Sequence, residues 1–352
     1  MFDFSPKSII TFFQESEEMR VRFDTILEMS GFEKVSREDI SFEDLPNELG
    51  ELRNGDLQME HDEIPFLGAY ILPPVWFGDV PRSEEVPLGN FVEIIEHEEI
   101  SGRRIVIKND GYFGISINTN IDGKYEWEEF LETREFCNFF LSILLINGIK
   151  AYSIHEIEVF NTIYVPEKDF LDEHRGYSKK SQIMFDIKHK PLNIGRFRVI
   201  RQLIPLAKIE TVLRTLKSLI NEKDFFNSLS LLINSYTNLM RGQYNESFIF
   251  SWVLVEQYIN HNWDIFVDGK SISKARKQKL NQKEYTANVK LNILTHLGLL
   301  EEEEYRDINK LRKKRNKVMH EIEFVNNHEA VFAYELAFKS IKKRISVYLS
   351  KR

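Results

Sequence analysis

The chain has 352 residues, of which 42% are hydrophobic and 12% aromatic, a composition typical of a globular protein long enough for two domains. Its net charge of −8 is uneven, because residues 222–352 carry a net +6 and residues 1–221 a net −14. This asymmetry suggests a polyanionic partner for the C-terminal part, and it is equally consistent with a solvated helical surface there. The single cysteine, Cys137, excludes an intramolecular disulfide and a thiolate metal cluster within one chain.

The start of the sequence, MFDFSPKSII, lacks the basic region and the continuous apolar core of a signal peptide. The longest apolar run, residues 139–149, is interrupted by polar residues and is too short to span a bilayer. We therefore expect a cytoplasmic protein that does not insert into a membrane. Cys137 lies in an apolar helical pattern, which predicts a small buried side chain rather than a nucleophile.

Residues 1–205 predict an α+β domain. The expected helices are residues 5–30 and 126–149. Residues 31–90 are interpreted as a segment without regular secondary structure. The expected strands are residues 91–100, 104–108, 112–118, 152–165, 181–187 and 197–203. Because turn signals at Ser101-Gly102 and Asp110-Gly111 separate the first three strands, an antiparallel meander is predicted there.

Beyond Pro205 the strand signals cease and helical periodicity begins. Residues 206–222 predict a helical connector, with its amphipathic helix at residues 208–220. Five further helices are expected at residues 223–240, 244–266, 284–297, 301–321 and 327–349. The change of pattern and of charge sign places a domain boundary near residues 205–225. The predicted fold is therefore an α+β domain followed by an all-α helical bundle at residues 223–352.

The helix expected at residues 301–321 carries the most informative polar residues. Arg315 falls within its apolar stripe, where an unpaired guanidinium is costly, so it should be paired or should line a cleft. Glu256, inside an almost wholly apolar helix, is the candidate partner. Asn316 and His320 are four residues apart and share one flank of their helix. His320 lies about 140° around the helix from Arg315, so the two side chains must reach a shared site from different sides.

The run from Arg315 to His320, Arg-Asn-Lys-Val-Met-His, resembles the Arg-polar-x3-His motif of the HEPN superfamily. The order of the helices over residues 223–352 and the acidic residue Glu256 are also similar to that family. The similarity is closest to its Apea-like branch, which is associated with phage defence. It covers a little over a third of the chain, and the N-terminal part shows no such resemblance.

The resemblance implies a bundle that dimerises and brings two such motifs into one cleft, where RNA, for example tRNA, is cleaved without a metal ion or a cofactor. His320 would exchange the proton of the attacking ribose 2′-hydroxyl, and Arg315 would stabilise charge on the scissile phosphate. Asn316 would orient the phosphate or the imidazole, and Glu256 would support the site. A 2′,3′-cyclic phosphate is the expected product, so DNA should not be cleaved.

Four basic residues surround the motif and are candidates to bind the RNA backbone: Arg312, Lys313, Lys314 and Lys317. The same residues are equally consistent with a solvated face that is balanced by the acidic run Glu301–Glu304. The aromatic residues Trp252, Tyr258 and Trp263 lie on the most apolar helix, which favours core packing over base stacking.

A second function class stays open, namely a non-catalytic dimerisation module that binds nucleic acid or a protein. The net charge of −14 on the N-terminal part would repel RNA, so that part is interpreted as a regulatory domain or a binding site for a trigger protein. No histidine pairs with another histidine or with the cysteine at the spacing of metal ligands, so no metal site is expected.

Overall fold

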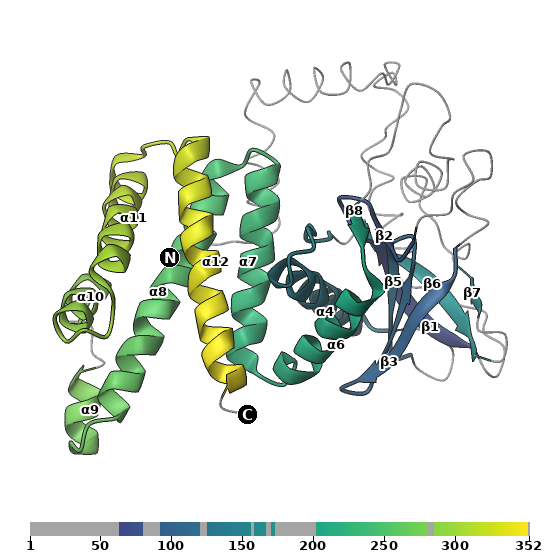
Figure 1. The fold of residues 1–352 in the computed structure, drawn as a ribbon, viewed down its shortest axis with the longest axis horizontal. Helices are drawn as coiled ribbons and strands as arrows, with labels where there is room; N and C mark the ends of the chain where they lie inside the picture. The colour runs from purple at the N-terminus through teal and green to yellow at the C-terminus, as the bar shows by residue number, and fades with distance from the viewer. Residues whose placement is uncertain are drawn as a thin grey trace. The chain divides into compact units, whose positions relative to one another are not determined.

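The computed structural model describes residues 63–79, 92–119, 125–155, 158–166, 170–172, 202–280 and 285–350. Within these residues a sheet region comes first and a run of helices follows (Figure 1). This order confirms the predicted succession of an α+β part and a helical part. The helix expected at residues 5–30 and the strand expected at residues 181–187 lie outside the described residues. None of the described helices combines the length and apolarity that crossing a membrane requires.

The main sheet has, among the described residues, six strands in the order β3-β4-β5-β1-β6-β7, and every neighbouring pair is antiparallel. Its strands are β1 (Ile64–Tyr70), β3 (Ile94–Ile100), β4 (Arg103–Lys108), β5 (Tyr112–Ser116), β6 (Phe160–Val165) and β7 (Phe170–Asp172). A second, short sheet pairs β2 (Val75–Phe77) in parallel with β8 (Gln202–Ile204). The predicted meander corresponds to β3, β4 and β5 and is confirmed. Its first turn has positive φ at both Ser101 and Gly102, as a tight two-residue hairpin requires.

The interpretation of residues 31–90 as irregular is wrong for β1 and β2. Strand β1 lies in the interior of the main sheet, between β5 and β6. Pro65 and Gly68 are residues that normally interrupt strands, so their presence in the sequence argued against a strand here. Gly68 is required because a Cβ atom there would lie 2.0 Å from the hydroxyl oxygen of Tyr112. Of the strand expected at residues 152–165, the described part contains β6, which begins at Phe160. Of the strand expected at residues 197–203, residues 197–201 lie outside the described residues and residues 202 and 203 belong to β8.

Helix α4 (Trp127–Ile146) packs on the sheet and confirms the helix predicted at residues 126–149. The rings of Phe113 on β5 and Phe140 on α4 lie with their centroids 5.1 Å apart. Cys137 is fully buried in this layer, and its burial raises the pKa of the thiol to about 12. Its complete burial confirms the prediction of a small buried side chain.

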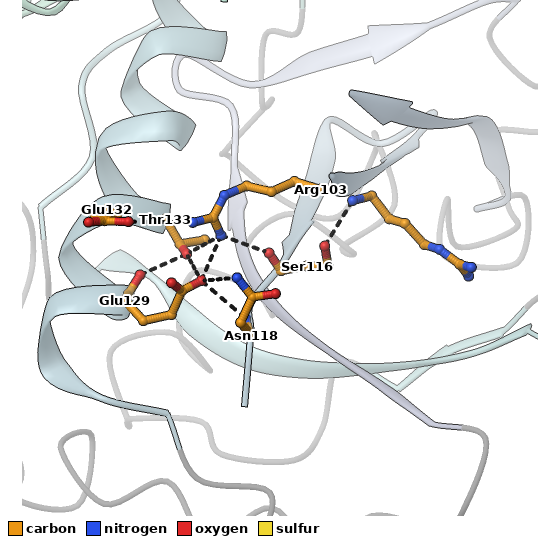
Figure 2. A network of polar contacts seen from close by, with 7 residues as sticks. Arg103, Ser116, Asn118, Glu129, Glu132 and Thr133 are labelled. Carbon is orange, nitrogen blue, oxygen red and sulfur yellow. Dashed lines mark hydrogen bonds and ion pairs between the residues drawn. The ribbon is translucent and has the colours of Figure 1, made fainter. Parts of the chain in front are cut away.

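Arg103 at the start of β4 joins the sheet to the first turns of α4 (Figure 2). Its Nη1 atom donates to Glu129 Oε1 at 2.9 Å, to Thr133 Oγ1 at 2.7 Å and to the carbonyl of Ser116 at 3.2 Å. The same carboxylate oxygen of Glu129 accepts from the backbone and side-chain nitrogens of Asn118, each at 3.1 Å. Each of these polar groups has a partner within the network. We therefore interpret the network as structural, because it fixes α4 on the sheet.

The helical part begins with α6, which lies within the predicted connector, and it contains the five helices predicted after it. Its helices are α6 (Leu206–Leu219), α7 (Lys223–Met240), α8 (Tyr244–Asp268), α9 (Lys274–Leu280), α10 (Ala287–His296), α11 (Glu302–Glu321) and α12 (Asn327–Ser350). Helix α9 was not predicted, because its seven residues carry four cations and none of them is buried. Such a segment has no apolar periodicity to detect.

The apolar core continues across the predicted domain boundary. One hydrophobic cluster includes residues of the sheet, of α4, of α6 and of the helices that follow. Two contacts make this junction concrete: Phe139 on α4 stacks on Phe226 on α7 at 4.8 Å, and the backbone nitrogen of Ser153 donates to Thr237 Oγ1 at 2.7 Å. The boundary near residues 205–225 therefore marks a change of secondary structure, and independent folding of the two parts stays a prediction.

Candidate functional site

Helix α11 packs against α8, α10 and α12 mainly through its first half. Ile308 and Leu311 are buried there, with at most 1% of either side chain exposed. The predicted apolar stripe is wrong beyond this point, because Val318 is only half-buried and Met319 is 54% exposed. The second half of α11, which carries the motif, therefore has a free surface within one chain.

Arg315 is half-buried and lies over the ring of Trp252 on α8, with the guanidinium carbon 5.8 Å from the ring centroid. Its Nη1 atom donates to Asn316 Oδ1 at 3.2 Å. A contact of this kind with an aromatic face contributes about 0.5–1 kcal/mol and holds the planar group in one orientation. No carboxylate of the described residues lies within ion-pair distance of Arg315. Its remaining N–H groups are therefore available to an anion.

The expected ion pair between Arg315 and Glu256 is not formed. Glu256 is half-buried on α8, one helical turn after Trp252, and has no cation within ion-pair distance among the described residues. The sequence pattern placed both residues at one interface between helices. Helical periodicity predicts which face of a helix is buried, but it does not predict which side chain of the neighbouring helix each residue contacts. The aromatic ring of Trp252 takes the place that the carboxylate was expected to occupy.

His320 lies in the last turn of α11 and is exposed. Asn316 precedes it by one turn and is half-buried, so the two residues share one flank of the helix as their spacing predicts. Within the described residues no side chain or carbonyl forms a hydrogen bond with the imidazole of His320. The ring is therefore free to reach a ligand or a second protein chain.

Lys314, one of the predicted RNA-binding residues, has partners within its own chain. Its Nζ atom lies 2.6 Å from Glu323, 2.9 Å from Glu329 and 3.1 Å from the carbonyl of Phe324, and its side chain is only 14% exposed. Burial by itself lowers the pKa of Lys314, but the hydrogen bonds to the two glutamates outweigh burial and raise it above its usual value. Lys314 therefore closes the loop between α11 and α12, which makes it a weaker candidate for contacting the RNA backbone than the other basic residues near the motif.

The other three basic residues near the motif are more accessible. Lys313 is exposed, and Lys317 is 55% exposed with only a loose contact of 3.6 Å to Glu323. Arg312 is half-buried and donates twice to Asn309 Oδ1, at 2.9 and 3.2 Å. Lys313 and Lys317 are thus the stronger candidates for phosphate contacts, and Arg312 is partly occupied within its own helix.

Three large apolar side chains within four residues of His320 in the sequence are exposed, and we call Met319, Ile322 and Phe324 the apolar rim. Their exposed fractions are 54%, 82% and 78%. Ile322 ends α11 with φ 55° and ψ 36°, a left-handed conformation that costs a β-branched residue on the order of 1–3 kcal/mol. A cluster of exposed apolar residues at a strained turn is typical of a surface that another protein covers.

The aromatic residues Trp252, Tyr258 and Trp263 are core residues, as predicted. Each has at most 4% of its surface exposed, so none presents a face on which a base can stack. Trp263 Nε1 donates to the carbonyl of Leu280 at 3.2 Å and thereby attaches α9 to α8. The sequence did not indicate that Trp252 also contacts Arg315, because the sequence around a buried aromatic residue does not identify the cation that packs against its ring.

In comparisons with known proteins, no protein-family model, no curated protein and no solved structure matches this chain. The described residues contain no group of three or more His, Cys, Asp or Glu side chains placed to hold a metal ion. What the site offers is therefore set by its own residues. It combines a guanidinium with unpaired donors, an adjacent amide and an exposed imidazole on the second half of α11.

Proposed function

We propose that the chain is a metal-independent endoribonuclease of HEPN type, with Arg315 and His320 as its catalytic residues. The observation that supports this most directly is the state of Arg315. Its guanidinium is held by Trp252 and Asn316 and still has free donors, as a site that stabilises a phosphorane-like transition state requires. His320 supplies the proton-exchanging group on the same exposed half of α11.

The proposed reaction needs no external reactant. His320 accepts the proton of the ribose 2′-hydroxyl, and the 2′-oxygen forms a bond to phosphorus. The bond from phosphorus to the 5′-oxygen breaks, and a second imidazole donates a proton to that oxygen. The products are a 2′,3′-cyclic phosphate and a 5′-hydroxyl. Arg315 stabilises the additional negative charge on the non-bridging oxygens during these steps.

A second copy of the chain supplies the second imidazole in this proposal. Five residues separate Arg315 from His320, which places them about 140° apart around α11. Each chain carries one such motif, so the second imidazole is proposed to come from a second copy of the motif. The apolar rim of Met319, Ile322 and Phe324 lies within four residues of His320 in the sequence, and its side chains are largely exposed. Burial of this rim against its copy would place both motifs at one interface and would offset the strain at Ile322.

Replacement of Ile322 and Phe324 by serine is expected to convert a dimer into a monomer, because it removes the two most exposed apolar side chains of the rim. Sedimentation velocity measures the change. The matched control replaces Leu297 and Leu299, exposed by 47% and 49% in the α10–α11 loop, and should remain dimeric. A wild-type chain that sediments as a monomer, or equal dissociation of both variants, would contradict dimerisation through the rim.

The chemistry predicts that only substrates with a free 2′-hydroxyl are cleaved. The purified chain is incubated in EDTA with an RNA oligonucleotide, with the DNA of the same sequence and with the 2′-O-methyl RNA. Only the unmodified RNA should be cut, because the other two lack the nucleophile. Cleavage of the DNA or of the 2′-O-methyl RNA would show that another reaction takes place.

The second candidate function is a non-catalytic dimer that binds RNA or a protein. Two observations favour it: no described residue orients the imidazole of His320, and Lys314 is occupied within the chain. In this case all three oligonucleotides stay intact, and binding is weakened by salt. His320→Ala would then leave the affinity for RNA unchanged within about twofold.

A further inference from the structure

The segment from Gly269 to Lys283 has an unusual charge pattern outside the candidate site. It contains six Lys or Arg residues and no Asp or Glu. A solvated helix usually mixes both signs and forms ion pairs between residues three or four apart. Lys270, Lys274, Arg276 and Lys279, which we call the α9 cations, are exposed, and none of them has an ion-pair partner among the described residues.

The backbone that carries the α9 cations is held in place. Lys277 Nζ donates to both the carbonyl and the side chain of Asp268 at the end of α8, each at 3.1 Å. Trp263 Nε1 donates to the carbonyl of Leu280, and Leu280 packs against the core. The cations therefore extend from a fixed support, which lowers the entropy that a bound ligand must remove.

The position of the α9 cations relative to Arg315 follows from α8. Arg315 lies over Trp252, and Lys277 is bonded to Asp268, sixteen residues further along the same helix. At roughly 1.5 Å per residue the two points are about 24 Å apart along α8. Figure 1 shows α9 at the C-terminal end of α8, and α11 packs against α8. This span corresponds to about seven nucleotides of a stacked strand at roughly 3.4 Å each.

The surface of α9 fits a nucleic acid better than a membrane. Ile272 and Leu280 are the large apolar residues of the segment; both are half-buried, and Leu280 packs into the core. An interfacial helix needs a free apolar face to enter a bilayer, and α9 has none. Exposed ammonium and guanidinium groups without carboxylate partners match the repeated negative charge of a phosphate backbone.

We propose that the α9 cations form a second RNA-binding surface, which holds the backbone of a single strand about seven nucleotides away from Arg315. This inference rests on the proposed function for its choice of RNA. It predicts that strands long enough to contact both places bind more tightly than short ones. The gain depends on salt, because each phosphate contact releases counterions.

The test measures binding, not cleavage. A fluorescein-labelled single-stranded RNA of about fourteen nucleotides is titrated with the full chain carrying His320→Ala, with and without replacement of all four α9 cations by glutamine. Each lost contact weakens binding roughly fivefold at roughly 0.1 M salt. We expect a loss of at least about 25-fold and a smaller salt slope. An RNA of about four nucleotides should bind both proteins equally.

The matched control removes four other exposed or half-buried cations, with Lys208, Arg214, Lys223 and Lys339 replaced by glutamine. It lowers the net charge by the same amount and should weaken binding less than about threefold. Equal losses in both variants, no loss in the α9 variant, or an α9-dependent affinity only for phosphatidylserine vesicles would overturn the inference. Circular dichroism of each variant verifies that the helices remain folded.

The outcomes also separate this inference from the proposed function. A wild-type chain that binds RNA through the α9 cations and never cleaves it would refute the ribonuclease and retain the binding surface. A chain that cleaves RNA and binds it equally well without the α9 cations would refute the surface alone.

Discussion

His320→Ala is expected to lower the rate of RNA cleavage by about 10²–10⁴-fold, the usual contribution of a general acid or base. The loss should appear in kcat, because the proton transfer occurs in the transition state and not in the bound substrate. His320 is exposed and makes no described side-chain contact, so the free energy of unfolding should change by less than about 0.5 kcal/mol. Single-turnover cleavage of a labelled RNA and denaturant unfolding measure the two quantities.

His328→Ala is the matched control for this variant. His328 is also exposed and lies in the first turn of α12, eight residues further along the chain. It belongs to no part of the proposed site, so its replacement should leave the cleavage rate within about twofold. Equal loss of activity in both variants, or retained activity in His320→Ala, would remove His320 from the mechanism.

Gly68→Ala is expected to destabilise the chain by about 3 kcal/mol or more. The added Cβ atom would lie 2.0 Å from the hydroxyl oxygen of Tyr112 and 2.5 Å from the ring carbon that bears it. Tyr112 cannot move away easily, because its side chain is fully buried and its hydroxyl is 2.7 Å from Thr162 Oγ1. Denaturant unfolding followed by circular dichroism measures the loss.

Two further variants control for this change. Gly269→Ala adds a Cβ atom whose nearest neighbour is the carbonyl oxygen of Ile265 at 3.4 Å, and φ is −69° there, so its effect should stay within about 1 kcal/mol. Gly68→Ala combined with Tyr112→Val should recover part of the loss, because the clashing ring is removed. A stable Gly68→Ala chain would show that β1 and β5 do not pack as described.

Five of the helices after α6 could be predicted from the sequence, and only α9 was missed among the described ones. The bounds expected for α7 are the observed Lys223–Met240, and α11 and α12 differ from expectation by a single residue at one end. Periodic apolar residues and the breaks at Gly242 and Gly298, both with positive φ, determine these limits. The sheet was harder to predict, because Pro65 and Gly68 argued against a strand at β1. Gly68 is required there by the close approach of Tyr112, a residue that is distant in sequence.

The site could be predicted as a set of residues on one helix, but not as a set of contacts. Local periodicity places Arg315, Asn316 and His320 on α11, and the structure does so too. The partner of Arg315 depends on how α8 and α11 are rotated against each other, and this rotation favours Trp252 over Glu256. Lys314 appeared to be one more surface cation, because its partners Glu323 and Glu329 approach it only when the chain turns at Ile322.

The most direct test of the account is to incubate total tRNA in EDTA with the wild-type chain and, in parallel, with His320→Ala. The ends of the products are then analysed. We expect fragments with 2′,3′-cyclic phosphate and 5′-hydroxyl ends from the wild type, and intact tRNA from the variant. Intact tRNA with both proteins, or equal cleavage by both, would contradict the assignment of ribonuclease activity to Arg315 and His320.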